Sequence, residues 1–392
     1  MWAIEDFTEI RRWYLFHVIL CVSFFLSSLI INAIQMILYI TIRPISKSLY
    51  RTINYYLMYS IMAQIMFLSE WWSMSEVRLH ADEKTKALLG KEHALIIMNH
   101  TYEVDWLMGW MVADSAKCLG AAKVFVKKMM QYVPTIGWAW RCSDIIFLSR
   151  NWQEDKSVMQ TQVKEFHDYP YPVWMLLFAE GTRFTPEKHE ASMKFAKERG
   201  LPQLKRLLIP RTRGFIQCAQ SLKGHFPAIY CVTAAFNTKE GAEPSILSML
   251  RGHKVIADMY IRRLPLSEVP TGDDEATAEY LQQLYQSKDK LLDSYCNTGS
   301  FSKESGMEDY KPIILQRRYA SLLNVVFWVT FITYWSLRLL HGANILLQCF
   351  AAGIILIACV GLYKLIGLTK IKKGSQYGSS SPGSSTDSKK KE

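Results

Sequence analysis

A histidine and an aspartate, His100 and Asp105, are the side chains best suited to acid–base chemistry in this sequence. They lie in the string N-H-T-Y-E-V-D at residues 99–105, directly after an apolar run, residues 94–98, that is typical of a buried strand. An aspartate five places on can fold back across a turn and hold one ring nitrogen, which leaves the other nitrogen free to accept a proton. The string therefore predicts a general base, although taken alone it also fits a structural histidine.

A second string, F-A-E-G-T-R at residues 178–183, again follows an apolar run, residues 173–178. Its glycine permits a tight turn and exposes backbone N–H groups. Its last residue, Arg183, is suited to bind a phosphate with two hydrogen bonds. Polar catalytic groups commonly follow strand ends in α/β folds, so we expect Arg183 to project from the same sheet edge as His100.

Other basic residues also lie close to apolar runs. Arg150 ends the string D-I-I-F-L-S-R at residues 144–150, and the string L-I-P-R-T-R-G-F at residues 208–215 leads into an expected helix. Lys128 precedes a segment that contains a proline and ends in Gly-Trp. Singly, each of these cations is more often a surface charge than a ligand. Their shared position after apolar strands predicts a site for an anionic substrate.

The alternation of apolar runs with polar, helix-like segments predicts an α/β domain with a mixed, mainly parallel sheet flanked by helices. The expected strands are residues 94–98, 145–148, 173–178, 228–235 and 255–261. The expected helices include residues 106–113, 153–166 and 274–295.

Long apolar runs at both ends predict attachment to a membrane. Residues 15–42 are long enough to cross a bilayer as a helix, and no small-residue cleavage site follows them. Residues 57–72 are shorter and end in a Trp-Trp pair, which favours a position in the membrane surface. Residues 322–340 and 343–366 predict a transmembrane hairpin.

The charges around this hairpin predict its orientation. Lysines and arginines lie before and after the pair of apolar runs, so both outer ends, and the catalytic domain that leads into the hairpin, are expected in the cytosol. The Ser/Gly-rich tail ends in K-K-K-E, which matches a dilysine signal for retrieval to the endoplasmic reticulum. We therefore expect a multi-pass protein of the endoplasmic reticulum membrane, and also consider the Golgi.

These boundaries divide the chain into four parts. We expect membrane-anchoring helices in residues 1–76, a catalytic domain in residues 77–300, a transmembrane hairpin in residues 301–368 and a disordered cytosolic tail in residues 369–392.

Composition narrows the class of partner. The 392 residues carry 46 Lys+Arg against 35 Asp+Glu, a net charge of +11, which suits an anionic partner. Half of the residues are hydrophobic and no nucleic-acid motif occurs, so a membrane or a phosphorylated small molecule is expected rather than nucleic acid. The eight cysteines form no C-x-x-C pair and the nine histidines no H-E-x-x-H, so we expect no metal site. No G-x-S-x-G, Walker or dinucleotide-binding motif is present, which argues against a serine hydrolase and nucleotide chemistry.

Taken together, the strings resemble the motifs of the glycerolipid (lysophosphatidic acid) acyltransferase family. N-H-x4-D, the arginine-bearing string ending at Arg150, F-x-E-G-T-R and the string around Pro210 occur in that family's order and spacing. The resemblance covers nearly the whole chain and is strongest to the branch that contains the gamma and delta 1-acylglycerol-3-phosphate acyltransferases. One departure is Cys231, where the branch commonly has aspartate; this puts the choice of acceptor in doubt but not the catalytic pair.

The resemblance implies the family's fold and mechanism. His100, oriented by Asp105, would remove the proton from the sn-2 hydroxyl of lysophosphatidic acid, which would then attack acyl-CoA directly. Acyl-CoA would be a co-substrate, and the resemblance implies no metal or redox cofactor. The lipid bilayer would hold the acceptor. Arg183, Arg150 and Lys128 would bind the phosphates of the acceptor or of CoA, and Glu180 would fix the motif turn or contact the acceptor. The implied substrate-binding residues are Lys128, Arg150, Glu180, Gly181, Thr182, Arg183 and Pro210.

Several alternatives stay open on the sequence. Another acceptor, such as lysophosphatidylinositol or lysocardiolipin, would leave the same motifs intact. A catalytically idle protein that shapes membranes through its hairpin has no use for a poised base, which His100 and Asp105 provide. A lipid hydrolase could use the same base on water; dependence on acyl-CoA would separate it from a transferase.

Overall fold

A computed structural model of the protein describes residues 11, 13–149 and 151–341, and ten residues of the segment that follows, namely 344–346, 348–350, 353, 356, 360 and 361. Arg150, most of the second expected hairpin helix and the C-terminal tail with its lysines lie outside the described residues.

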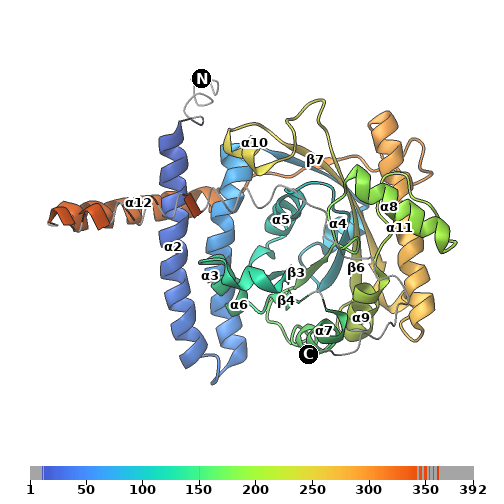
Figure 1. Ribbon diagram of the computed structural model, residues 1–392, viewed down its shortest axis with the longest axis horizontal. Coiled ribbons are helices and arrows are strands. Elements are labelled where there is room, and N and C mark those ends of the chain that lie inside the picture. Colours follow the sequence, from blue (N-terminus) through green and yellow to red (C-terminus); the bar gives the residue numbers. More distant parts are fainter. Residues whose placement is uncertain are drawn as a thin grey trace, which may run out of the picture.

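The centre of the molecule is an eight-stranded sheet of order β4-β3-β5-β2-β6-β7-β1-β8 (Figure 1). Five of its neighbouring pairs are parallel, while β6–β7 and β1–β8 are antiparallel. The expected mixed, mainly parallel sheet is therefore confirmed. The strands are β1 (Glu76–His80), β2 (Ala94–Met98), β3 (Ala122–Lys127), β4 (Ile146–Leu148), β5 (Trp174–Leu177), β6 (Ala228–Phe236), β7 (Ile256–Pro265) and β8 (Ile313–Ile314).

The two middle strands, β2 and β6, are apolar because helices cover both of their faces. All five residues of β2 and the first eight of β6 are buried. Strands covered on both sides lose the alternation of polar and apolar residues and become continuous apolar runs. This is why the sequence revealed them clearly.

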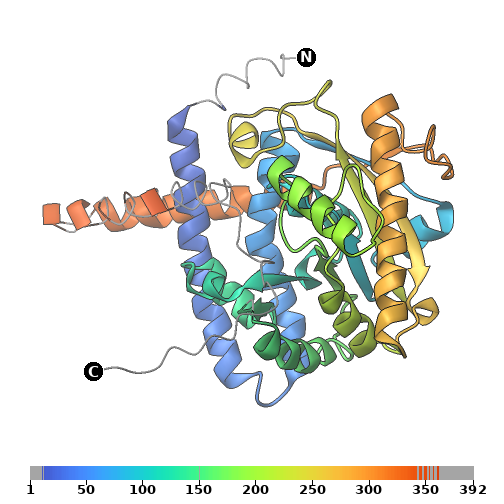
Figure 2. The same cartoon turned by 45° about the vertical axis from the view of Figure 1, so that its right-hand side comes forward.

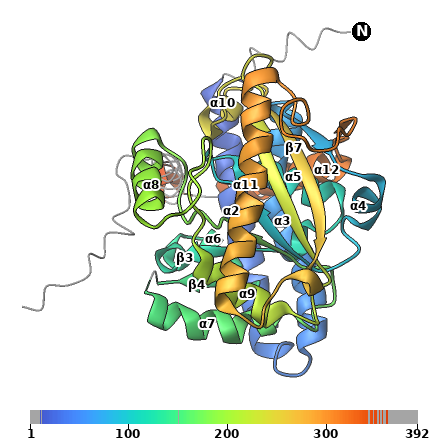
Figure 3. The ribbon, with the colours of Figure 1, turned by 90° about the vertical axis from the view of Figure 1, so that its right-hand side faces the viewer.

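Each face of the sheet has its own layer of helices and its own apolar core. One layer is made chiefly of α7, α9 and α11, the last of which lies in front of the sheet in Figure 3. The other layer contains α3, α5, α6, α10 and the start of α12. The helices of the domain are α4 (Glu83–Leu88), α5 (Asp105–Ser115), α6 (Ile136–Cys142), α7 (Trp152–Lys164), α8 (Pro186–Glu198), α9 (Thr212–Leu222), α10 (Ile246–Leu250) and α11 (Asp274–Thr298), with short 3₁₀ turns η2 (Leu119–Ala121), η3 (Lys128–Tyr132) and η4 (Leu266–Glu268).

Among the described residues, two helices are long and apolar enough to cross a membrane: α2 (Tyr14–Thr41) and α12 (Tyr319–His341). They contact each other, and α12 runs across α2 rather than alongside it in Figures 1 and 2. Between α2 and the domain lies α3 (Lys47–Phe67), which ends in the π-helical turn η1 (Leu68–Trp72). The apolar stretch at 57–72 is thus the second half of a longer helix that packs on the domain.

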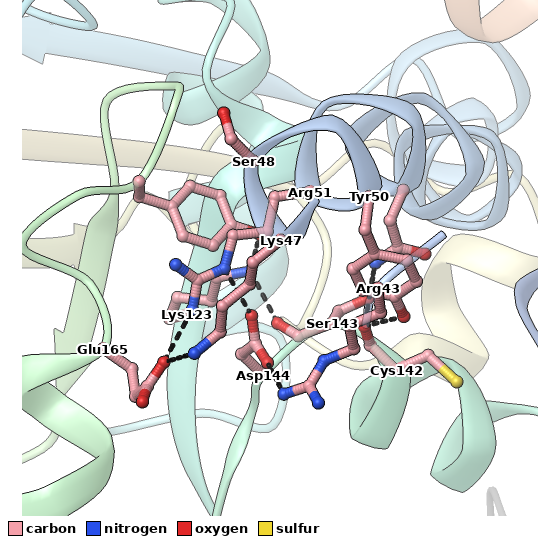
Figure 4. Close-up of polar contacts among 12 residues, drawn as sticks. Arg43, Lys47, Ser48, Tyr50, Arg51, Lys123, Cys142, Ser143, Asp144 and Glu165 are labelled. Carbon is pink, nitrogen blue, oxygen red and sulfur yellow. Dashed lines mark hydrogen bonds and ion pairs between the residues drawn. The ribbon is translucent and has the colours of Figure 1, made fainter. Parts of the chain in front are cut away.

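A partly buried ion-pair cluster attaches α3 to the domain (Figure 4). The Arg51 guanidinium donates to Asp144 at 3.0 Å and to Glu165 at 3.2 Å, and its side chain is only 5% exposed. Behind it, the buried Lys123 ammonium donates to the Ser143 carbonyl at 2.7 Å. Removing one partner of such a buried pair leaves the other charge uncompensated. The α2–α3 hairpin is therefore fixed to the domain by charge as well as by apolar contact.

A second polar junction holds the base of α12. Arg318 donates to the Asp114 carboxylate at 2.7 Å, and the Ser321 hydroxyl donates to the buried Glu70 of η1. Burial raises the pKa of Glu70 to about 7. These contacts join the first turn of α12 to the end of α5 and to the π-helical turn.

Candidate active site

The two motif strings meet at the carboxyl end of the sheet. Strands β2 and β5 are parallel neighbours, and the strings begin where these strands end. Their loops are joined directly, because the Phe184 N–H donates to the His100 carbonyl at 2.8 Å. The expectation that both strings share one sheet edge is therefore confirmed.

Asn99 fixes the point at which the loop leaves the sheet. Its side-chain oxygen accepts from the Ala234 N–H at 2.8 Å, and its amide donates to the Ala234 carbonyl at 2.9 Å. The buried side chain thus pairs with β6 as a backbone residue would. Both polar atoms of the amide are satisfied, and His100 starts from a fixed position.

His100 and Asp105 lie together as the sequence predicts. The Nδ1 atom of His100 is 2.9 Å from the Asp105 carboxylate oxygen Oδ2. The same oxygen accepts from the Thr101 N–H at 2.6 Å and the Tyr102 N–H at 2.9 Å. Asp105 is the first residue of α5, so its carboxylate folds back over the helix N-terminus. Three donors converge on one oxygen and hold the carboxylate against the imidazole.

Burial distinguishes the two members of this pair. The Asp105 side chain is 1% exposed, while that of His100 is 18% exposed and stacks on the Phe178 ring at 4.1 Å between centroids. Burial raises the pKa of the Asp105 carboxyl above its usual range, although His100 and the two N–H donors oppose the rise. An imidazole held on one side by a buried carboxylate and open on the other is suited to accept a proton.

The Glu180 side chain holds the backbone of His100. One of its carboxyl oxygens accepts from the His100 N–H at 3.1 Å, and the side chain is buried. Burial raises the pKa of Glu180 to about 8; the Asp105 carboxylate adds to the rise, while the His100 N–H and Lys288 oppose it. In the structure Glu180 therefore fixes the backbone of the motif loop.

Gly181 has a backbone that favours glycine. Its φ is +69°, and a Cβ atom there would lie 2.9 Å from the Arg211 side chain. The Arg211 N–H donates to the Ala179 carbonyl at 2.7 Å, which brings the segment after the buried Pro210 against the motif turn. The strings at residues 178–183 and 208–215 are thus in direct contact, and glycine permits this approach.

Two cations and an acid lie at the other end of the motif. The Arg183 guanidinium is 3.8 Å from the Glu103 carboxylate, and Glu103 also accepts from the Ile246 N–H of α10. The Lys188 ammonium donates to the Thr182 hydroxyl at 2.6 Å and to the Arg183 carbonyl at 3.1 Å. Lys188 was missed by the sequence analysis. Its position, six residues after Thr182 on the first turn of α8, was the only available signal.

The remaining predicted cations are Lys128 and Arg150. Lys128 begins η3 with an exposed side chain, and within the described residues no hydrogen bond or ion pair joins it to His100 or Arg183. Arg150 lies outside the described residues. Their expected roles at the phosphates remain predictions.

An apolar cavity of about 720 Å³ opens beside His100. Its volume falls in the range typical of ligand sites, about 300–1,000 Å³. Side chains from α2, α3, α5 and the sheet line it, among them Phe24, Met62, Trp106, Leu176 and Phe178. The sequence analysis did not predict which residues line it, because they are scattered from His17 to Val325.

Within the described part of the chain, no group of three or more His, Cys, Asp or Glu side chains could hold a metal ion.

Comparison with known proteins assigns the chain to a family. A family model for acyltransferases matches residues 76–236, and a model for the acyltransferase C-terminus matches residues 248–328. The chain is 39% identical over 376 residues to the Homo sapiens 1-acyl-sn-glycerol-3-phosphate acyltransferase delta. The aligned region covers 95% of this chain and 96% of that protein. It is 40% identical over 373 residues to the gamma protein of Homo sapiens, over 94% and 96% of the two chains. The chain belongs to the glycerolipid acyltransferase family. No solved structure gives a significant match.

The two family models match different parts of the chain, and the motif loops and α11 fall in different matched regions. His100, Asp105 and Glu180 lie in the first matched region, while α11 lies in the second. Cys231, the departure noted above, is buried in β6 opposite Ile97 of β2. The two matched regions meet in the structure, because α11 packs against β6.

Proposed function

We propose that the protein transfers an acyl group from acyl-CoA to the sn-2 hydroxyl of lysophosphatidic acid, which yields phosphatidic acid. The observation that carries the proposal is the position of His100, held by Asp105 and facing an apolar cavity. The names of the gamma and delta relatives support the choice of acceptor.

In the proposed reaction His100 is the general base. Its Nδ1–H donates to Asp105, so Nε2 accepts the proton of the sn-2 hydroxyl. The hydroxyl oxygen attacks the thioester carbonyl, and the resulting oxyanion is stabilised by backbone N–H groups near the motif turns. When the intermediate collapses, the C–S bond breaks and the proton on His100 passes to the departing CoA sulfur. Asp105 stabilises the imidazolium that exists between these two transfers.

The substrates have chemically distinct environments. The apolar cavity suits the acyl chain, since the side chains that line it are almost entirely hydrophobic. Arg183, with Lys188 beside it, suits the phosphate of the acceptor or those of CoA. We assign the substrate-binding roles to these residues together with Lys128, Arg150 and the motif residues Glu180, Gly181, Thr182 and Pro210.

We further propose a location in the endoplasmic reticulum membrane, with the catalytic domain and C-terminus in the cytosol. The apolar helices α2 and α12 and the charges that flank the C-terminal apolar runs support this arrangement. A membrane location suits an amphiphilic acceptor, because its chain can stay in the bilayer while its head group reaches His100.

The test is an acyl-transfer assay on microsomes that contain the wild type or His100→Ala, with labelled oleoyl-CoA and a panel of lysophospholipids. We expect incorporation into phosphatidic acid by the wild type and a loss of at least about 10²-fold in the variant. Transfer to lysophosphatidylinositol or lysocardiolipin instead would overturn the acceptor and keep the mechanism. Equal activity in both proteins would contradict the role of His100, and no transfer by the wild type would favour a membrane-shaping protein.

A further inference from the structure

A lysine from the C-terminal region lies buried behind the motif loops. Lys288 belongs to α11 and has no exposed surface. Burying an ammonium group costs free energy unless hydrogen bonds and opposite charges compensate it. Burial lowers the pKa of Lys288 below its usual value. Such a residue invites the question of what its charge does at this position.

Its hydrogen bonds reach two strands that support the site. The Lys288 ammonium donates to the Val232 carbonyl of β6 and lies 3.5 Å from the Ile97 carbonyl of β2. Ile97 comes three residues before His100, and Val232 comes two residues before Ala234, which pairs with Asn99. The ammonium therefore bridges β2 and β6 just before the loop that carries His100.

The groups around Lys288 determine what its charge acts on. The charged and titratable groups that face it are the Glu180 carboxyl, the Cys231 thiol of β6, the Arg262 guanidinium of β7 and the Tyr285 ring of its own helix. Among these, the carboxyl of Glu180 is the group that also accepts from the His100 N–H. The cation is thus coupled to the motif loop through Glu180.

We propose that Lys288 is a positioning residue of the active site: its buried ammonium ties β2 to β6 behind His100 and sets, through Glu180, the electrostatic potential in which His100 accepts a proton. This proposal rests on the role proposed above for His100. It extends the site to α11, which the second family model covers.

The sign of the effect follows from the charges near His100. The Asp105 carboxylate binds the imidazole, the Glu180 carboxyl accepts from the His100 backbone N–H, and Arg183 interacts electrostatically with Asp105. The Asp105 carboxylate favours the protonated imidazole, and the Lys288 cation opposes it. Without that cation, the imidazolium becomes easier to form. A base that is protonated at higher pH loses activity at higher pH.

The experiment compares full-length wild type with Lys288→Met and Lys288→Gln, each assayed for acyl transfer to lysophosphatidic acid across pH. Methionine removes both the charge and the donors, whereas glutamine keeps a donor for the two carbonyls without the charge. We expect the acidic limb of the kcat/KM profile to move to higher pH by about one unit in both variants. Thermal unfolding is measured on the same preparations.

Lys123 supplies the matched control. Like Lys288, it is a buried lysine. Its ammonium donates to the Ser143 carbonyl and the Tyr169 hydroxyl, and the nearby carboxylate is Asp144 rather than Glu180 (Figure 4). Lys123→Met should lower the unfolding temperature and leave the pH of the acidic limb unchanged. An equal shift in the Lys123 and Lys288 variants would overturn the proposal.

The outcomes separate this inference from the proposed function. A wild type that acylates no lysophosphatidic acid fails the proposed function. If the wild type is active and the Lys288→Gln variant has the same pH profile, the proposal for Lys288 is wrong and the proposed function stands. If Lys288→Met does not fold, Lys288→Gln decides, since its donors replace those of the ammonium.

Discussion

Replacing Asp105 by asparagine separates the charge of this residue from its geometry. Oδ2 accepts from the His100 ring, the Thr101 N–H and the Tyr102 N–H. The carbonyl oxygen of an asparagine can accept from the same three donors, while the second carboxyl oxygen, Oδ1, has no hydrogen-bond partner to lose within the described residues. The substitution therefore leaves the loop in place and removes the negative charge.

The size of the effect follows from Coulomb's law. Two unit charges about 4 Å apart interact by about 4 kcal/mol at an effective dielectric constant of about 20. This interaction exists only when His100 carries a proton, as it does in the proposed intermediate. Its loss raises the barrier by that amount, and about 1.4 kcal/mol corresponds to a tenfold change in rate. We therefore expect Asp105→Asn to lower kcat by about 10³-fold.

The assay measures initial rates of acyl transfer and thermal unfolding on the same purified variants. Asp114→Asn is the matched control, since Asp114 is equally buried at the other end of α5, where it pairs with Arg318. The control should lose stability, because Arg318 keeps its charge, and should retain activity within about tenfold of wild type. If Asp105→Asn is also within tenfold of wild type, or if the two variants lose activity equally, the reasoning about the charge is wrong.

The remaining predictions concern the motif loop and the cavity. The pKa of Glu180 is raised to about 8 from 4.5, so its contribution to stability is present below pH 4.5 and is lost as pH rises through 8. The unfolding temperature of the wild type should therefore fall between these two pH values. Glu180→Gln should make this fall smaller. Parallel curves for the two proteins would contradict this. Gly181→Ala places a Cβ 2.9 Å from Arg211 at a φ of +69°, so it should destabilise the protein by about 1–3 kcal/mol in chemical denaturation, and an unchanged midpoint would count against the strain. Gly109→Leu adds a side chain at the cavity wall and should shift preference towards shorter acyl-CoA chains in a competition assay; an unchanged preference would remove the cavity as the acyl site.

The sequence predicted the elements whose burial leaves a clear pattern. The run that became β2 is apolar throughout and that of β6 is apolar except for Thr233, while α11 shows helical spacing over 25 residues. Strands β1 and β3 were missed because each mixes charged with apolar residues: β1 reads E-V-R-L-H and β3 reads A-K-V-F-V-K. Their pairing is set by neighbours distant in the chain, which local patterns do not record.

The candidate site divides in the same way. The pairing of His100 with Asp105 could be predicted because five residues and one turn separate them. Lys288 could not, because a lysine within the string K-D-K-L-L looks like part of a solvated helix face. Its burial depends on the position of α11 against β2 and β6, which only the tertiary structure supplies.

The crossing of α2 and α12 limits how the protein can meet a membrane. A flat bilayer has a single normal, and two straight helices that cross steeply cannot both lie along it. If α12 spans the bilayer, then α2 runs along its surface or tilts strongly, with outward side chains such as Ile37 and Ile40, 60% and 67% exposed, towards the acyl chains. Because α2 also lines the cavity beside His100, such an orientation would place the cavity entrance at the level of the acyl chains of the bilayer. A lipid chain could then enter the cavity directly from the membrane.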